Sequence, residues 1–109
     1  TTDDITPIMS DLPTEIPQLF HIVDGFIQHF ATKSEEMQNA LNDSDWSRLE
    51  GLAHWLKGTG GTAGFSCLTE PALQLELKAK RREKDPANRL IEEFTRLGKR
   101  LSAKKNRFQ

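Results

Sequence analysis

The chain has 109 residues, of which 36% are hydrophobic, a size that suits one domain with one modest core. Its single cysteine excludes an internal disulfide framework and a cysteine-built metal site, and no apolar run approaches the roughly 20 residues of a membrane span. The net charge of −1 is the sum of −8 over residues 1–75 and +7 over residues 76–109. The sequence shows no signal peptide, so we expect a cytoplasmic protein.

The first long segment with helical periodicity extends from about residue 14 to 42. Its apolar residues follow one another at steps of four and three, which predicts one amphipathic helix. They are Ile16, Phe20, Val23, Ile27, Phe30, Met37 and Leu41. Pro13 and Pro17 lie near its start, where a missing N–H is tolerated. Residues 1–13 are expected to form a short helix or an arm.

A second helix is expected after residues 42–45, whose Asn, Asp and Ser are typical of a turn and a helix cap. Its buried face consists of Trp46, Leu49, Ala53 and Leu56. The segment continues into glycines at positions 58, 60, 61 and 64, which admit two interpretations. Either the helix ends at Gly58, or it continues at a cost of about 1 kcal/mol per glycine and keeps a smooth surface for another chain.

The third helix is predicted from apolar residues at steps of four, three and four. They are Leu68, Ala72, Leu75 and Ala79. With Ser66 as N-cap, Pro71 would fall just past the first turn, the part of a helix in which proline is tolerated. The helix is therefore expected to begin near Thr69 instead, or to bend at the proline. Nearby Cys67 is expected to be a small buried residue.

A fourth helix is expected to begin at Asp85 and Pro86, with the aspartate as N-cap and the proline in the first helical position. Its buried face consists of Leu90, Phe94, Leu97 and Leu101. Four such helices with short connections predict an all-α, antiparallel up-down four-helix bundle over residues 14–103. The arm precedes it and a basic tail at 104–109 follows, so that residues 1–109 form a single domain.

Among the three histidines, His54 has distinctive neighbours. His21 and His29 lie beside the apolar face of the first helix and are expected to be surface residues. At about 100° per residue, Lys57 and Gly58 fall on the same side of the second helix as His54, outside its buried face. An imidazole, an ammonium group and bare backbone are therefore expected side by side.

The spacing also brings a carboxylate to His54. If the chain reverses near Phe65, His54 and Glu76 each lie eleven residues from the turn and at the same height on antiparallel helices. Glu76 would accept a hydrogen bond from Nδ1–H and leave Nε2 as a nucleophile, while Lys57 would neutralise an anion bound there. This suits transient attachment of a phosphoryl group, and the alternative is a surface histidine among mixed charges.

The stretch from Ala53 to Phe65 resembles the signature of histidine-containing phosphotransfer (HPt) domains. In that signature a histidine is followed by lysine three residues later and by glycine four, seven and ten residues later. Leu68 and the Leu75-Glu76 pair continue the pattern, and the resemblance covers about residues 19–101. Pro71 departs from the pattern and leaves the height of Glu76 in doubt.

The resemblance assigns a role to each residue of the motif. It implies that His54 accepts the phosphoryl group on Nε2, that Lys57 balances its charge and that Glu76 orients the imidazole. Gly58 and Gly61 match glycines that let a partner approach, and Gly64 matches a further one. Next to the histidine, Trp55 is expected to be partly exposed and to contact the docked partner.

The family's function is relay of phosphoryl groups between receiver domains. The resemblance implies a phosphorelay intermediate that accepts the group from a receiver aspartate and passes it to the receiver aspartate of a response regulator. It implies no cofactor on this domain, Mg²⁺ on the receiver, and no ATP-dependent kinase activity of this chain. The first methionine is Met9, which indicates a piece of a longer protein, and the resemblance implies the C-terminal module of a bacterial hybrid sensor histidine kinase. Because its exposed faces are charged, we expect a monomer, without nucleic-acid or membrane contact.

Two other functions fit the sequence less well. A non-catalytic helical module would bind a polyanion or a protein through its basic surface at residues 78–107. An enzyme using His54 as general acid or base would need a pocket and a further catalytic group. A compact four-helix bundle with its histidine exposed offers little concavity for such a pocket.

Overall fold

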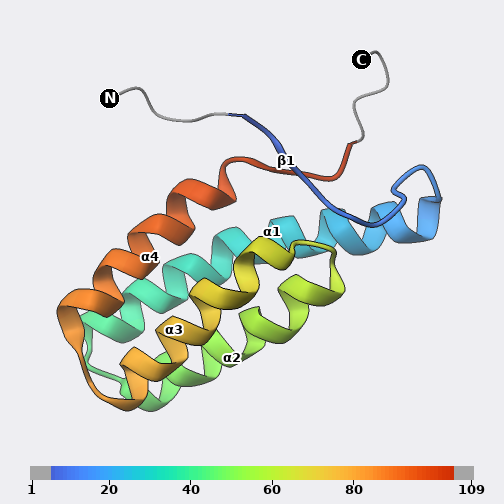
Figure 1. The fold of residues 1–109 in the computed structure, drawn as a ribbon. Coiled ribbons are helices and arrows are strands. Elements are labelled where there is room, and N and C mark those ends of the chain that lie inside the picture. Colours follow the sequence, from blue (N-terminus) through green and yellow to red (C-terminus); the bar gives the residue numbers. More distant parts are fainter. Residues whose placement is uncertain (1–5, 105–109) are drawn as a thin grey trace.

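The computed structural model describes residues 6–104, which form an all-α helical bundle with one small pair of strands (Figure 1). Neighbouring helices run in opposite directions, as the sequence predicts. The elements are β1 (Ile8–Met9), α1 (Pro17–Asn42), α2 (Trp46–Thr62), the 3₁₀ turn η1 (Ser66–Leu68), α3 (Thr69–Lys80), α4 (Lys84–Gly98) and β2 (Leu101–Ser102). Within residues 6–104, no helix is long and apolar enough to cross a membrane.

Helix α1 begins at Pro17, a little later than predicted. Ile16 precedes it in an extended conformation, with φ −83° and ψ 118°, and its carbonyl accepts from the N–H groups of Leu19 and Phe20. Proline is favoured at the first helical position, where its missing N–H has no acceptor within the helix. Ile16, the first residue of the predicted apolar stripe, is 44% exposed and lies outside the helix.

Helix α2 continues through the glycine run to Thr62, which decides between the two interpretations. The side chain of Asp45 caps its start by accepting a hydrogen bond from the backbone N–H of Arg48 at 3.2 Å. Gly58, Gly60 and Gly61 are therefore all helical.

The connection between α2 and α3 includes the short 3₁₀ turn, and α3 itself begins at Thr69. Pro71 thus lies in the first turn of α3, where its missing N–H leaves no helical hydrogen bond unmade. The interpretation that the helix begins near Thr69 is confirmed. Cys67 is exposed on the 3₁₀ turn, so the prediction that it is buried is wrong.

Both predicted ends of the fourth helix are wrong. Helix α4 begins at Lys84, after an extended Glu83 with φ −93° and ψ 97°, so Asp85 lies inside the first turn rather than at the N-cap. An acid there still interacts favourably with the helix dipole. The helix ends at Gly98, and Leu101 belongs instead to β2, where its backbone pairs with Ile8.

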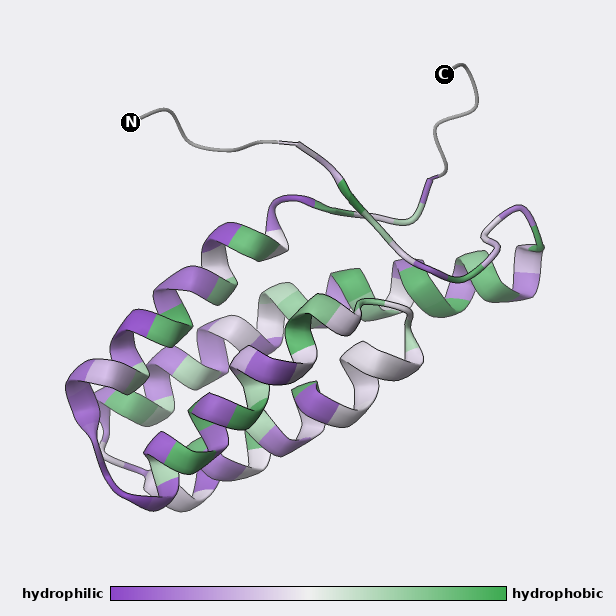
Figure 2. Cartoon of the chain, viewed as in Figure 1, coloured by the Kyte–Doolittle hydropathy of each residue, from purple (hydrophilic) through white to green (hydrophobic). Residues whose placement is uncertain are grey.

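The core lies between the helices and is mainly aliphatic, with a group of aromatic rings near the α2–α3 connection. Phe26, which the predicted apolar stripe omitted, contacts Phe30, Phe65 and Trp55 with ring centroids 5.7 to 5.9 Å apart. Figure 2 shows hydrophobic and hydrophilic residues alternating along the helices, and a hydrophilic connection between α3 and α4.

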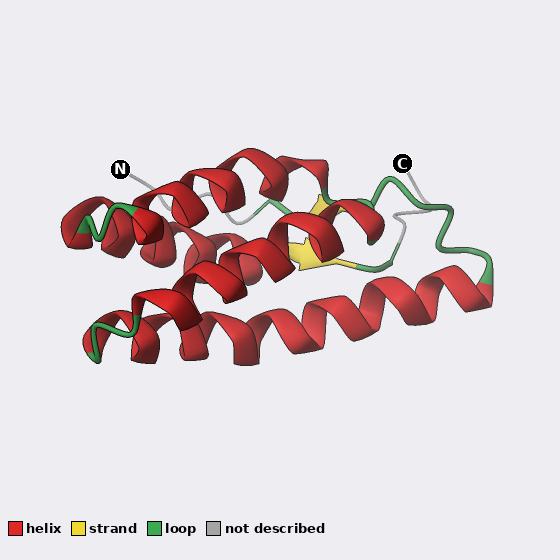
Figure 3. Cartoon of the chain, turned by 90° about the horizontal axis from the view of Figure 1, so that it is seen from below, coloured by secondary structure: helices red, strands yellow, loops and turns green. Residues whose placement is uncertain are grey.

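The described part of the N-terminal segment is an arm rather than a helix, and it packs across the end of α2. Strand β1 pairs in parallel with β2, a pairing that the sequence did not predict (Figure 3). Beyond β1, the hydroxyl of Ser10 donates to the carbonyl of Ala63 at 2.6 Å, and the N–H of Asp11 donates to the carbonyl of Gly64 at 2.9 Å. The remainder of the predicted arm, at 1–5, and most of the predicted tail, at 105–109, lie outside the described residues.

Candidate functional site

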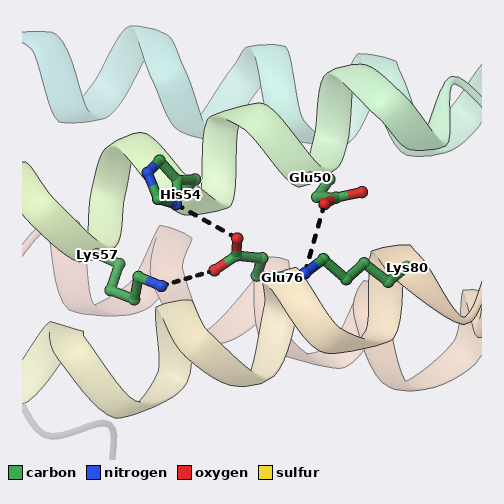
Figure 4. Close-up of polar contacts among 5 residues, drawn as sticks. All are labelled: Glu50, His54, Lys57, Glu76 and Lys80. Carbon is green, nitrogen blue, oxygen red and sulfur yellow. Dashed lines mark hydrogen bonds and ion pairs between the residues drawn. The ribbon is translucent and has the colours of Figure 1, made fainter.

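The imidazole of His54 lies on the surface of α2 and faces α3 (Figure 4). Its side chain is 69% exposed, and its Nδ1 lies 3.3 Å from Oε2 of Glu76. The two helices are antiparallel and joined by a short connection, so residues equally far from that connection lie opposite each other. The predicted pairing is therefore present, and Pro71 does not displace Glu76 from it.

Glu76 is the buried member of this group, and it also binds Lys57. The ammonium of Lys57 donates to Oε1 of Glu76 at 2.9 Å, while the glutamate side chain is only 11% exposed. The hydrogen bond from Lys57 is the main cause of a lowered pKa of Glu76. Burial opposes that shift, and the charge of Lys57 and the contact with His54 add to it. Glu76 is therefore ionised at neutral pH.

The ionised carboxylate determines which nitrogen of His54 carries the hydrogen. A carboxylate can only accept hydrogen bonds, so Nδ1 of the imidazole must be the protonated nitrogen when it binds Glu76. In the neutral ring, the other nitrogen, Nε2, then keeps a free lone pair. The site thus holds a nucleophile in one tautomer at an exposed position.

A second ion pair lies one helical turn away. Lys80 follows Glu76 by four residues on α3, and its ammonium lies 3.8 Å from Oε2 of Glu50, which precedes His54 by four residues on α2. An open groove of about 430 Å³ lies beside these groups, lined by Ser47, Glu50, Gly51, His54 and Glu76. Glu50 and Lys80 were not among the predicted site residues, although their spacing of four residues from His54 and Glu76 was a usable signal.

The glycines of α2 differ in what surrounds them. Gly58 is exposed, and a methyl group there would meet nothing within 4 Å. Gly61 is also exposed, with only the hydroxyl of Thr69 nearby, at 3.8 Å. Gly60 is buried, and a methyl group there would contact Leu68 at 3.4 Å. Gly58 and Gly61 thus belong to the surface near His54, whereas Gly60 serves close helix packing.

Trp55 is half-buried and lies on the side of α2 that faces α1. Its ring stacks on Phe26, and the ammonium of Lys33 lies 5.6 Å from the ring centroid. Trp55 lines an open groove of about 520 Å³ together with His21 and His29, both exposed as predicted. Its role in docking a partner stays a prediction.

The family model of the Hpt domain matches residues 21–104, a stretch that contains His54, Lys57 and Glu76. No curated protein and no solved structure matches the chain.

Proposed function

The chain belongs to the Hpt domain family, and on this premise we propose that His54 is the phosphoacceptor of a phosphorelay. Histidine phosphotransfer in two-component signalling, with receiver domains as partners, is the function of this family. In our proposal His54 takes the phosphoryl group from the aspartate of one receiver domain and passes it to the aspartate of a response regulator. The exposed imidazole, held through Nδ1 by the buried Glu76, is the observation that supports this.

The proposed step needs no proton transfer within this domain. The lone pair of Nε2 attacks the phosphorus atom of the aspartyl phosphate, and an N–P bond forms as the P–O bond to the aspartate breaks. The electron pair of that P–O bond leaves with the aspartate carboxylate. Nδ1 keeps its hydrogen, and the carboxylate of Glu76 stabilises the positive charge that develops on the imidazole. Transfer to the second receiver is the reverse step.

Lys57 and the exposed glycines have supporting roles in this proposal. Lys57 holds Glu76 ionised in the unmodified protein, and because Lys57 and His54 bind the same carboxylate, its ammonium would offset the phosphoryl charge. Gly58 and Gly61 present backbone without side chains, which lets the receiver's aspartate approach Nε2. Trp55 lies next to His54 in the chain and would contact the docked receiver.

The setting of the domain is also part of the proposal. We place Mg²⁺ on the receiver partner, whose acidic pocket binds it, and no cofactor on this domain. We further propose that the domain acts as a monomer and forms part of a bacterial hybrid sensor kinase. The resemblance of the motif to domains of such kinases supports this placement.

A transfer assay tests the proposed function. The chain is mixed with a phosphorylated receiver domain and Mg²⁺, and we expect it to acquire an acid-labile, base-stable phosphoryl group. His54→Gln is expected to remove this labelling, whereas His29→Gln, a change of an exposed histidine on α1, is expected to leave it intact. Labelling that persists in His54→Gln would show that the acceptor is a different residue.

A further inference from the structure

The pair formed by Glu50 and Lys80 makes the surroundings of His54 electrically balanced. Around the imidazole of His54 lie two carboxylates, Glu50 and Glu76, and two ammonium groups, Lys57 and Lys80. The charges alternate along both helices, so each faces an opposite charge across the α2–α3 groove (Figure 4). A phosphoryl group on Nε2 would add about −1.5 to −2 charges at pH 7 and break this balance.

The two lysines differ in how firmly they are held. Lys57 binds the buried Glu76 at 2.9 Å, so moving it away would leave a buried carboxylate with one partner fewer. Lys80 lies 3.8 Å from Glu50 and its side chain is 54% exposed. Exposed ion pairs at such a distance stabilise a protein little, so Lys80 can leave Glu50 at small cost.

The direction of α3 brings the side chain of Lys80 toward the level of His54. Helical side chains lean toward the N-terminus of their own helix, which on α3 is the direction from Lys80 to Glu76 and so to the level of His54. Figure 4 shows the stem of Lys80 running along α3 toward Glu76. Glu50 lies on the antiparallel α2, so its own lean is away from His54.

We propose that Lys80 is a second phosphoryl-binding cation of this site. Glu50 holds its ammonium while His54 is unmodified, and the ammonium moves to the phosphoryl oxygens once Nε2 is phosphorylated. The exchange breaks one ion pair and forms another, without a covalent step. The inference rests on the proposed function of His54, and it assigns Lys80 to the bound group rather than to the partner.

The test uses the isolated chain, phosphorylated chemically with phosphoramidate, so that no receiver partner is needed. The ³¹P signal of phosphorylated His54 is the one absent from His54→Gln, and its shift is followed from about pH 5 to pH 9, a range around the second phosphoryl ionisation near 6. Removing a nearby cation raises the pKa of a phosphoryl group, so Lys80→Gln is expected to raise it by about 0.3 to 0.7 units, as for a partly exposed charge pair.

Two further variants separate the proposed contact from general charge effects. Lys78→Gln removes the same charge from α3, but Lys78 pairs with Glu83 instead, so the phosphoryl pKa should stay close to that of the unchanged protein. Combining Lys80→Gln with Glu50→Gln restores the formal charge of the unchanged protein without restoring the ammonium group. Most of the rise in the phosphoryl pKa should therefore persist. Circular dichroism confirms that each variant is folded.

The outcomes separate the role of Lys80 from the proposed function of His54. A phosphorylated Lys80→Gln that titrates like the unchanged protein overturns the role of Lys80. A combined variant that titrates like the unchanged protein also overturns it, because Lys80 would then only neutralise Glu50. A chain in which His54 takes no phosphoryl group from phosphoramidate or from any receiver overturns the proposed function, and the role of Lys80 with it.

Discussion

Replacing Gly58 by alanine is expected to stabilise the folded chain, although glycine at this position belongs to the family motif. Gly58 lies inside α2, and its added methyl group would meet no atom within 4 Å. An exposed helical glycine costs about 1 kcal/mol relative to alanine. We therefore expect Gly58→Ala to raise the unfolding free energy by about 1 kcal/mol, and the melting temperature by roughly 4 °C.

Urea unfolding followed by circular dichroism measures this change, and two other glycines provide controls. Gly51 has the same open surroundings in α2, so Gly51→Ala should give a gain of similar size. Gly64 has a φ of +88°, and a methyl group there would meet the hydroxyl of Ser10 and, at 2.9 Å, the N–H of Asp11. Strain and overlap together should make Gly64→Ala lose about 2–4 kcal/mol. A loss of stability in Gly58→Ala would refute the conclusion that Gly58 faces open space.

Four further changes test the site and the core. Gly58→Glu should keep the bundle folded by circular dichroism and prevent phosphoryl transfer from a receiver, whereas unfolding would contradict an exposed Gly58. Lys57→Ala should slow that transfer, measured as a time course. It should also lower the unfolding free energy by about 1 kcal/mol, because Glu76 loses a hydrogen bond. An unchanged transfer rate would argue against the role of Lys57. Glu76→Gln should be less stable than the unchanged protein above about pH 4.5. The difference in unfolding free energy should shrink as the pH falls, because the lowered pKa of Glu76 means that its carboxylate stabilises the fold only while it is ionised. Ser34→Ala should unfold at equal or higher urea concentration, because the buried Ser34 hydroxyl forms no hydrogen bond within residues 6–104. A loss of unfolding free energy above about 1 kcal/mol would contradict this reasoning.

The residues of the site follow from local sequence patterns. A spacing of three or four residues places side chains on one face of a helix, which is why the sequence alone groups His54 with Lys57 and Gly58. Equal distances from the turn then place Glu76 opposite His54, and the 3.3 Å contact confirms that pairing. The four helices were predictable for the same reason, because their buried faces repeat with the helical period.

The ends of the helices and the pairing of the two strands depended on tertiary contacts. The Asp-Pro sequence at residues 85–86 predicted a helix cap, but α4 begins one residue earlier, at Lys84. At the other end, Leu101 lies outside the helix and its backbone pairs with β1. A two-residue strand has too few residues to show a periodicity, so neither β1 nor its parallel partner could be read from the sequence.

The electrostatic arrangement of the site was likewise decided by the packing of α2 against α3. From the sequence, Lys57 was expected to neutralise a phosphoryl group on His54, but in the unmodified protein its ammonium binds the buried Glu76. The sequence showed no role for Glu50 or Lys80, because they meet only across the groove between two antiparallel helices. Local spacing thus determined which chemical groups lie together on the surface of each helix. Only the packing of α2 against α3 decided which charges face one another, because the pairing of charges depends on how the two helices are aligned.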